Sequence, residues 1–563
     1  MANRITTGNV YKSLLWGGLL IVALGLRLGA LDLVPLSPDE ARIALLSLDV
    51  VRGEGWPAST DTPLLLMGNA LLFLLLGPTE VTARLLPALA GVGLVAVPWL
   101  WRRRLGESGA LVAAALLTLS PIALFDARRL DAGIIAVLGA ALVITALATR
   151  SPHPHLLLGP GLALGLTGGP LFYDVLLPGL LAWALARHLL SETAPLGRKA
   201  LLRGLLLGVG GALLTATGFG LRWSGWSEPA SGLAAWVQSW WSGDDAVGLG
   251  PLLLYEPLTL LLVGVSLYFD ARRADGTLLL PGLWAVVSAL LIWLRAASPL
   301  AALVPLALLA GRGAAHLLSA LKKAWTTGLH LFLTFLFWGF AGLVLIRQTS
   351  YLQQGLEFFL ASLVVLVQVL LIMGFASATH LTTACRSFWI GTALILLLLQ
   401  VSFAWRLNYN EATAPYEPLT TTLASRDLYN LPATVESLRR VAHVSPENFE
   451  LVLVAGEPGV TAAVRWALRA WPALRVTSTW PVEPPHLVVS PENVTPSAGA
   501  VETFRGMAFT ATRRAESLVP ACSSLMPPIC AGPIDWYVFR QSPAPVERTC
   551  LILWAPAPFA DAP

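Results

Sequence analysis

Two clusters of charged residues stand out in an otherwise apolar chain: Asp39-Glu40 and Arg128-Arg129. Adjacent carboxylates beside a hydrophobic segment can take a proton, bind a cation or hold a polar substrate at a membrane surface. Adjacent arginines can bind a phosphate through charge-assisted hydrogen bonds, and Asp131 follows closely enough to orient one of them. The simpler interpretations are that the acidic pair caps a helix and that the basic pair belongs to a solvated turn with an internal ion pair.

The composition is that of a membrane protein with many hydrophobic segments. Of the 563 residues, 56% are hydrophobic and 12% are charged, whereas soluble domains carry about 25% charged residues. The net charge is only +4, and no basic tract with interleaved aromatic residues indicates nucleic acid binding. The lipid bilayer is therefore an expected partner, and nucleic acid is not.

Segments long enough to cross a bilayer predict about 13 transmembrane helices. Their orientation follows from the tendency of Arg and Lys to remain in cytoplasmic loops. With Arg4, Lys12 and Arg102-Arg103-Arg104 in the cytoplasm, only one crossing can lie between residues 31 and 101, so the short apolar segment 64–76 is expected to lie on or dip into the outer face of the cytoplasmic membrane. The predicted spans are 12–30, 82–101, 109–126, 131–149, 155–170, 171–189, 200–221, 251–269, 277–295, 299–315, 327–346, 356–377 and 387–405.

The chain divides into two predicted domains. Residues 1–405 form the transmembrane domain, and residues 406–563 form a domain that this topology places outside the cytoplasm. The second part alternates short apolar runs with helical patterns, which predicts an α/β fold. Its Pro- and Ala-rich stretches, 518–534 and 542–563, are expected to be loops or a frayed tail.

The first outer loop, at about 31–81, is acidic and contains a predicted amphipathic helix. Before Leu64 it carries six acidic and two basic residues, a net charge of −4. Residues 41–51 have apolar side chains at helical spacing, which is typical of a helix lying in the membrane interface. Asp39 and Glu40 fall in its first turn, where the helix dipole favours negative charge.

Two further groups of residues allow two interpretations each. Residues 222–250 hold five tryptophans, which either anchor the chain at the membrane interface or stack on a sugar. Cys522 and Cys530 either form a disulfide or remain reduced, and Cys550 makes the number of cysteines in this domain odd.

A series of short motifs follows in a fixed order along the transmembrane part: Asp39-Glu40, Asp61-Thr62-Pro63-Leu64, Phe73–Gly77, Ala83–Leu89, Arg103–Gly106, Ser120-Pro121 and Arg129-Leu130-Asp131. This order resembles the GT-C type of membrane-embedded glycosyltransferases, which includes protein O-mannosyltransferases and the aminoarabinose transferase of lipid A. A finer resemblance is to the flippase-activity-associated proteins of archaeal and chloroflexal N-glycosylation clusters. It rests on Tyr255-Glu256-Pro257-Leu258, Ser298-Pro299, Ala414–Pro418 and Arg465–Arg469.

The resemblance implies inverting transfer of a sugar from a polyprenyl-phosphate donor to an acceptor on the outer face of the membrane. It implies Asp39 as the catalytic base with Glu40 beside it, and Arg128, Arg129 and Asp131 at the donor phosphate. Some relatives use a divalent cation, so Mg²⁺ or Mn²⁺ at Asp39, Glu40 and Asp131 is an expectation. Further candidates for a substrate cavity are Asp61, Asp174, Arg222, Tyr255, Glu256 and Arg295.

Several cationic positions of the family are absent from this chain. Asp61-Thr62-Pro63 stands where relatives have Lys-Pro-Pro or His-Gly-Pro, and Thr167-Gly168-Gly169-Pro170 lacks the lysine of Thr-Lys-Gly-Pro. Two other functions therefore stay open. One is a non-catalytic accessory role in handling lipid-linked glycans; the other is a transporter, against which the lack of detectable inverted repeats argues. The sugar and the acceptor are left open as well.

Overall fold

The computed structural model describes most of the chain. The described residues are 2–57, 59–149, 151–190, 197–242, 248–271, 279–295, 297–320, 380–410, 417, 419, 422–481, 485–494, 504–515 and 546–557, with scattered positions between 366 and 377. The predicted span 327–346 lies outside them, and the predicted span 356–377 does so in large part. Cys522 and Cys530 are outside them too.

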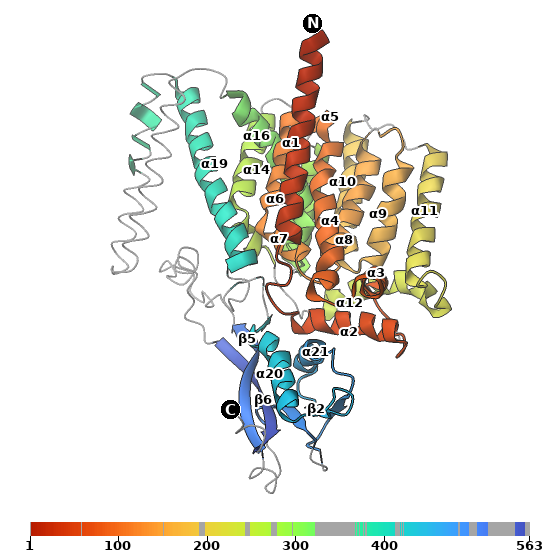
Figure 1. The fold of residues 1–563 in the computed structure, drawn as a ribbon. Coiled ribbons are helices and arrows are strands. Elements are labelled where there is room, and N and C mark those ends of the chain that lie inside the picture. The colour runs from red at the N-terminus through yellow and green to blue at the C-terminus, as the bar shows by residue number, and fades with distance from the viewer. Residues whose placement is uncertain are drawn as a thin grey trace.

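The transmembrane part is a bundle of apolar helices that run side by side (Figure 1). Within the described residues, five helices are long and apolar enough to cross a membrane, or six if the bent pair α6–α7 forms one span. This confirms a membrane protein, whereas the number of thirteen spans stays a prediction. The bundle helices are α1 (Ala2–Leu28), α4 (Glu80–Leu100), α6 (Glu107–Leu119), α7 (Pro121–Ala127), α8 (Gly133–Ala148), α9 (His155–Thr167), α10 (Leu171–Leu190), α11 (Arg198–Ala216), α14 (Pro257–Ala271), α15 (Leu279–Arg295), α16 (Leu300–Ala320) and α19 (Leu381–Trp405).

Two helices of the first loop lie across one end of this bundle, which we call the α2 face (Figure 1). They are α2 (Pro38–Arg52) and α3 (Pro63–Leu76). The predicted amphipathic helix is thus confirmed, with Asp39 and Glu40 in its first turn. A capping box between Ser37 and Glu40 begins it, and Gly53 ends it in the left-handed conformation, with φ 74°.

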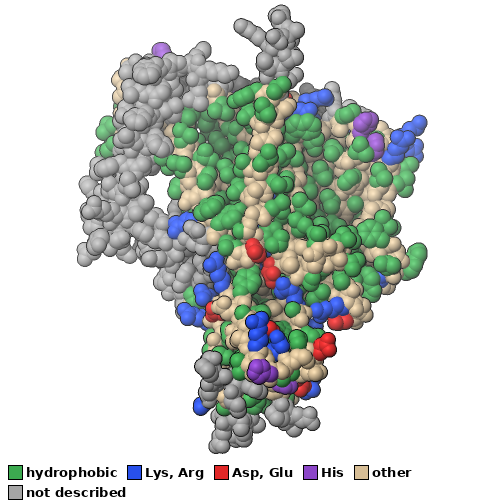
Figure 2. All heavy atoms as spheres, viewed as in Figure 1, with side chains coloured by type: hydrophobic (Ala, Val, Ile, Leu, Met, Phe, Trp, Pro, Cys, Tyr) green, Lys and Arg blue, Asp and Glu red, His purple; other side chains and the backbone are tan. Residues whose placement is uncertain are grey.

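Short helices complete both ends of the bundle. At the end opposite the α2 face, α5 (Arg102–Leu105) joins α4 to α6. The tryptophan-rich segment forms η1 (Trp223–Ser227) and α12 (Glu228–Ser242), and α13 (Gly250–Tyr255) precedes α14. Figure 2 shows hydrophobic side chains along the height of the bundle, and charged ones gathered around α2 and the C-terminal domain. This is the distribution expected for a helical bundle surrounded by lipid.

The C-terminal part forms an α/β domain beneath α2 (Figure 1). Its six-stranded sheet has the order β1-β5-β6-β4-β2-β3, in which β2 runs parallel to β3 and β4 while the remaining pairs are antiparallel. The strands are β1 (Leu423–Ala424), β2 (Leu451–Val454), β3 (Leu474–Thr477), β4 (Leu487–Pro491), β5 (Phe504–Ala515) and β6 (Val546–Pro556). The helices are α20 (Asp427–Val441) and α21 (Pro458–Ala467).

One sequence prediction for this domain is wrong. Residues 542–563 were expected to be loop or tail, but 546–556 form β6, which pairs with both β4 and β5. Leu551, Leu553 and Ala555 are buried at every second position, which is the period of a strand with one face on a core. The prolines around this segment concealed that alternation. Cys550 lies in β6 opposite Thr510 of β5.

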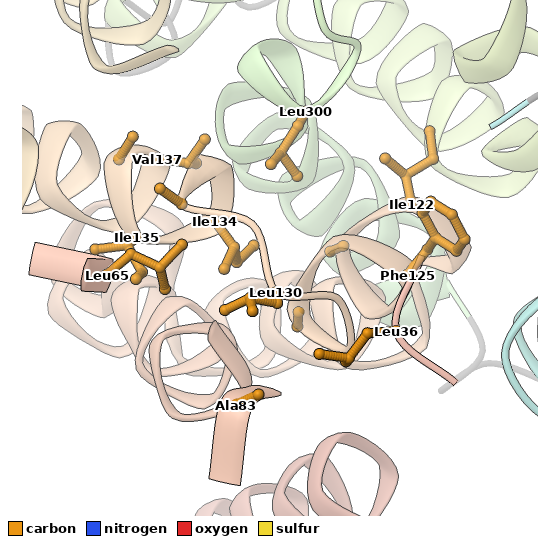
Figure 3. Packing of buried hydrophobic residues seen from close by; sticks show 14 of the residues in the cluster. Leu36, Leu65, Ala83, Ile122, Phe125, Leu130, Ile134, Ile135, Val137 and Leu300 are labelled. Carbon is orange, nitrogen blue, oxygen red and sulfur yellow. The ribbon is translucent and has the colours of Figure 1, made fainter. Parts of the chain in front are cut away.

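A cluster of buried apolar side chains joins the bundle to the C-terminal domain. Figure 3 shows part of it, where Leu36 from the loop before α2 and Leu130 from the loop before α8 pack in the same region as Ala83 of α4. The two loops that carry the candidate residues are therefore fixed on a common apolar support.

Candidate active site

Glu40 forms the centre of the hydrogen-bond network on the α2 face. Its carboxylate accepts two hydrogen bonds from the guanidinium of Arg84, at 2.9 and 2.8 Å. It also accepts from the backbone N–H groups of Ser37, at 2.8 Å, and of Leu130, at 2.7 Å. Burial alone would raise the pKa of Glu40, but the charge and hydrogen bonds of Arg84 outweigh it and lower this pKa to about 2. Glu40 is thus a buried anion whose oxygens are already engaged.

Arg84 holds the chain between α1 and α2. Besides its ion pair with Glu40, it donates to the backbone oxygens of Leu31, at 2.6 Å, Val34, at 2.8 Å, and Pro35, at 3.1 Å. Both side chains of the pair are about 5% exposed. Together they fix the position at which α2 begins, and with it the direction of Asp39.

Arg128 caps the C-terminal end of α1. Its guanidinium donates to the backbone oxygens of Leu26, Gly29 and Ala30, at 3.0, 2.6 and 2.8 Å. It also lies 4.3 Å from the ring centroid of Tyr409, whose hydroxyl donates to Leu26. The last carbonyls of a helix have no partner within the helix, and here a side chain from the α7–α8 loop supplies one. Most donors of Arg128 are therefore used within the protein.

Arg27 stabilises the bend between α6 and α7, whose axes meet at an angle of 59°. Pro121 has no N–H, so the carbonyl of Leu117, four residues earlier, loses its helical partner. The guanidinium of Arg27 donates to that carbonyl at 2.9 Å. Ser120 caps the start of α7 by accepting from the N–H of Ala123 at 3.1 Å. The loop with Arg128 and Arg129 follows directly from this fixed turn.

Arg129 is less constrained than these arginines. It is half-buried, makes one long hydrogen bond to the hydroxyl of Ser37, at 3.4 Å, and lies 5.1 Å from the ring centroid of Phe125. Its positive charge contributes to the low pKa of Glu40. Among the residues that the structure describes, it has no other hydrogen-bond partner, so most of its donors are available to a ligand.

Asp39 and Asp131 are both exposed. Within the described part of the chain, Asp39 makes no hydrogen bond or ion pair. Asp131 accepts from the N–H of Gly133, at 3.0 Å, which closes the turn before α8. It does not pair with either neighbouring arginine among the described residues, so the predicted orienting role of Asp131 is not seen.

These residues surround a small cavity of about 60 Å³ on the α2 face. Its charged lining groups are Glu40, Arg84, Arg128 and Arg129, and its apolar walls include Pro35 and Phe125. The structure thus brings the two charged clusters of the sequence together. Asp39 does not line this cavity; it is exposed and precedes Glu40, which does line it.

A larger cavity of about 590 Å³ lies between the bundle and the C-terminal domain. It shares Pro35 with the first cavity and is lined by residues of α20 and α21, including Tyr429 and Trp466, and by Arg469, which follows α21. Glu80, at the start of α4, forms an ion pair with Arg469 at 3.2 Å and accepts from the indole N–H of Trp466 at 3.0 Å. These contacts hold the C-terminal domain against the α3–α4 turn.

Asp174 and Arg295 form a separate buried ion pair. Asp174 also accepts from the indole N–H of Trp236 at 2.7 Å, and the guanidinium of Arg295 lies 4.7 Å from the ring centroid of Trp240. The pair therefore joins α10, α12 and α15. Two of the five tryptophans pack on this pair, whereas Trp223, Trp226 and Trp241 are 81%, 68% and 80% exposed, as interfacial anchors would be.

Arg222 and Asp61, two further candidates for a substrate cavity, do not line the cavity beside Glu40. Arg222 pairs with Glu228 and donates to the backbone oxygen of Pro57 at 2.8 Å, which anchors the middle of the first loop. Asp61 is exposed, and its backbone oxygen lies close to Gly169 and Gly232. These contacts place Asp61 beside α12, in a different neighbourhood from Glu40 and Arg84.

Tyr255 and Glu256 are buried in the bundle. The hydroxyl of Tyr255 donates to Glu417, and Glu256 accepts from the hydroxyls of Ser120 and Thr259 and from the amide of Gln400. Neither residue lines the cavity beside Glu40. Their contacts join the α6–α7 break to α14 and α19.

Glu40 does not fit its expected role as a ligand of Mg²⁺ or Mn²⁺. A cation at Glu40 would have to displace the guanidinium of Arg84 from both carboxylate oxygens. Within the described residues, no three His, Cys, Asp or Glu side chains gather closely enough to hold a metal ion. Asp39 and Asp131 remain as exposed carboxylates, and Mg²⁺ can be held by one or two carboxylates together with water and phosphate oxygens, so a divalent cation at these two residues stays a prediction.

Sequence reasoning missed Arg27 and Arg84 as members of this site. Arg84 stood inside a recognised motif, Ala83–Leu89, but its partner is 44 residues away. A signal was present, because an arginine near the end of an apolar span needs a counter-charge or carbonyl partners. Arg27 could have been found in the same way, near the end of the first span.

No family model and no curated protein sequence matches the chain. Among solved structures, it is similar to ArnT from Cupriavidus metallidurans bound to undecaprenyl phosphate, with 16% identity, 88% of this chain and 97% of that chain covered, and a TM-score of 0.51. The chain has a GT-C-like fold.

Two further solved structures are similar to this chain. The apo form of the same ArnT gives 14% identity, a TM-score of 0.50, and coverage of 90% of this chain and 98% of that chain. An oligosaccharyltransferase from Archaeoglobus fulgidus, in complex with zinc and sulfate, gives 12% identity, a TM-score of 0.32, and coverage of 84% and 68%. The predicted resemblance to the GT-C type is confirmed at the level of the fold.

Proposed function

We propose that this protein transfers a sugar from a polyprenyl-phosphate donor to a hydroxyl acceptor at the α2 face. The observation that carries the proposal is the charge of the cavity beside α2, where Arg84, Arg128 and Arg129 surround one carboxylate, Glu40. A buried excess of positive charge is unfavourable without an anion, and a phosphate supplies one. The similarly folded ArnT has been crystallised with undecaprenyl phosphate, which supports this choice of anion.

The proposed reaction is a direct displacement at the anomeric carbon. Asp39 takes the proton of the acceptor hydroxyl while the oxygen forms a bond to the anomeric carbon, and the bond from that carbon to the phosphate oxygen breaks. The leaving group is the polyprenyl phosphate. Arg129, whose donors are largely unused, stabilises the negative charge that develops on it. No metal ion takes part in this scheme.

Glu40, Arg84 and Arg128 act as positioning residues in this proposal. Their hydrogen bonds to the backbone fix the start of α2 and the end of α1, so Asp39 and Arg129 approach the substrate from a rigid frame. The acceptor reaches Asp39 from the larger cavity between the domains, which adjoins the first cavity at Pro35. The α2 face is then the outer face of the cytoplasmic membrane, with the C-terminal domain outside the cytoplasm.

Asp39→Asn tests the proposed base. Removing a general base typically lowers turnover by about 100- to 10,000-fold, and we expect this loss with reconstituted protein and a panel of polyprenyl-phosphate sugars. Because Asp39 is exposed and unpaired among the described residues, the melting temperature should not change. Glu54→Gln, beyond the other end of α2, is the matched control and should remain active. Full activity of Asp39→Asn would contradict the assignment, and unfolding would show that Asp39 only caps the helix.

Arg129→Gln tests the proposed phosphate contact. We expect weaker binding of undecaprenyl phosphate, by about ten- to a hundredfold for the loss of a charge-assisted contact of 1.5–3 kcal/mol. Arg103→Gln, an exposed arginine on α5 at the opposite end of the bundle, is the control for overall charge. An equal loss of affinity in both variants would reject a specific phosphate site.

A second candidate function is binding of a lipid-linked glycan without catalysis. It is favoured by one observation: Arg84 and Arg128 use most of their donors on protein carbonyls and Glu40, whereas Arg129 makes one long hydrogen bond to the described residues. In that case undecaprenyl phosphate binds, Arg129→Gln weakens it, and no sugar is transferred by the wild type.

A further inference from the structure

The end of the bundle opposite α2 carries a cleft that the proposed reaction does not use. It lies between α1, α4 and the start of α6 and has a volume of about 570 Å³. Its lining includes Lys12, Trp16, Leu20, Ala96, Trp99 and Glu107. α5 and the N-terminal end of α1 also lie at this end of the bundle (Figure 1).

Beside the cleft, α1 packs on the bundle through apolar side chains. Ala23 is fully buried against Val95, Ala114 and Leu117. Toward the N-terminus, Trp16, Leu19 and Leu20 of α1 pack against the same cluster but are only partly buried. The cleft lies beside this partly buried stretch of α1.

The mouth of this cleft is positively charged. Lys12 is exposed and forms no ion pair with any described residue. Arg102 lies 3.9 Å from the ring centroid of Trp99 and 3.9 Å from a carboxylate oxygen of Glu107. Arg103 follows on the same short helix and is exposed. Lys12 and Glu107 line the cleft and Arg102 lies against its lining residues Trp99 and Glu107, so the net charge of these groups is positive.

The interior of the cleft is apolar. Trp16 and Leu20 stand four and eight residues after Lys12 on α1, which at 1.5 Å per residue places them about 6 and 12 Å deeper. The lining thus changes from charge, through an indole ring, to an aliphatic side chain along the helix axis. A diacyl phospholipid has the same order of chemistry, from a charged headgroup to hydrocarbon, and tryptophan rings favour the boundary between them.

We propose that this cleft binds an anionic diacyl phospholipid. Lys12 and Arg102 contact its phosphate and headgroup, and Trp16, Leu20 and Ala96 contact the upper part of one acyl chain. The site is independent of the proposed sugar transfer, because it lies at the opposite end of the bundle from Asp39 and Arg129.

The test compares phosphatidylglycerol with phosphatidylcholine of the same chain length, retained by the purified full-length protein and counted by native mass spectrometry. We expect the wild type to retain phosphatidylglycerol preferentially. Lys12→Gln should lower this retention about fivefold, the factor that corresponds to about 1 kcal/mol for one basic residue near anionic lipid. Ala96→Trp, which fills the cleft without a change of charge, should lower retention of both lipids.

Lys199→Gln is the matched control, because it removes one exposed cation from the start of α11, at the same end of the bundle. It should leave retention unchanged. Equal retention of the two lipids by the wild type would overturn the proposal, as would equal effects of Lys12→Gln and Lys199→Gln. Displacement of phosphatidylglycerol by equimolar undecaprenyl phosphate would also overturn it, since the cleft would then bind the carrier lipid. The result for Ala96→Trp is used only if its melting temperature is near that of the wild type. If it is not, the comparison of Lys12→Gln, at an exposed position, with Lys199→Gln is sufficient to test the proposal.

Discussion

Glu40→Gln is the change that best separates a structural from a chemical role in the acidic pair. The substitution keeps the shape of the side chain but removes its charge. The new amide also places an NH2 group against donors, because the oxygens of Glu40 accept from Arg84, from the N–H of Ser37 and from the N–H of Leu130. Arg84 would remain buried without its counter-charge.

The expected loss of stability follows from the structure in two ways. The pKa of Glu40 falls from an ordinary 4.5 to about 2, and at about 1.4 kcal/mol for each pKa unit this corresponds to about 3 kcal/mol. Removing one partner of a buried ion pair typically destabilises by about 3–5 kcal/mol. The pair is about 5% exposed on both sides, so solvent screening does not reduce these values. We therefore expect a loss of about 3–5 kcal/mol.

The pH dependence of wild-type stability has a defined sign. Because the pKa of Glu40 is lower in the folded state, its contribution is fully present above the ordinary value of 4.5 and is lost as the pH falls from there toward about 2. Glu40→Gln should remove this part of the acid transition. Thermal melting in detergent from pH 7 down to pH 3 measures it, with Asp39→Asn as the neighbouring control of equal charge.

The reasoning fails if Glu40→Gln and Asp39→Asn melt at the same temperature at pH 7. It also fails if Arg84→Met, combined with Glu40→Gln, destabilises by the sum of the single changes, because partners in one buried pair should show coupling of about 0.5–3 kcal/mol. Loss of activity in Glu40→Gln without loss of stability would instead make Glu40 a reacting group.

Two other predictions concern the frame around the site. Arg128→Gln removes donors from the carbonyls of Leu26, Gly29 and Ala30, so we expect the free energy of unfolding to fall by about 2–3 kcal/mol in thermal or denaturant melting. Its effect on the affinity for undecaprenyl phosphate should be smaller than that of Arg129→Gln. The opposite order in a titration would make Arg128 the phosphate ligand. Arg469→Ala breaks the ion pair with Glu80 and should expose the connection to the C-terminal domain, so limited proteolysis between the domains should be several-fold faster; unchanged cleavage would show that apolar contacts alone hold the domains.

The parts of the fold that were predictable are those set by local pattern. Apolar length located the bundle helices, and helical spacing with Ser37 and Gly53 at its ends located α2. Strand β6 was missed because its alternation, at Leu551, Leu553 and Ala555, is flanked by prolines. The number of spans could not be verified, because several bundle helices are shorter than a bilayer requires and two predicted spans lie wholly or in large part outside the described residues.

The site was predictable as a set of elements but not as a set of contacts. The meeting of the loops before α2 and before α8 was expected, and the hydrogen bond from the N–H of Leu130 to Glu40 shows how they meet. The partners of the charged groups could not be read from the chain, because each lies far away in sequence: Arg84 for Glu40, and the end of α1 for Arg128. The sequence shows which charged residues each loop carries, but only the packed structure shows which of their donors and acceptors are used within the protein.

The lysines of the family motifs are missing from this chain. The cations that this chain retains beside Glu40 are arginines, and an arginine has five donors in a fixed fork, enough to bind backbone carbonyls and still present a positive field to a cavity. Arg84 and Arg128 do the first, and Arg129 is left for the second. If the phosphate depends on Arg129 together with the field of the other two, the donor affinity should fall with rising salt concentration in the wild type and should fall less steeply in Arg129→Gln. A salt dependence identical in both would mean that the anion binds elsewhere.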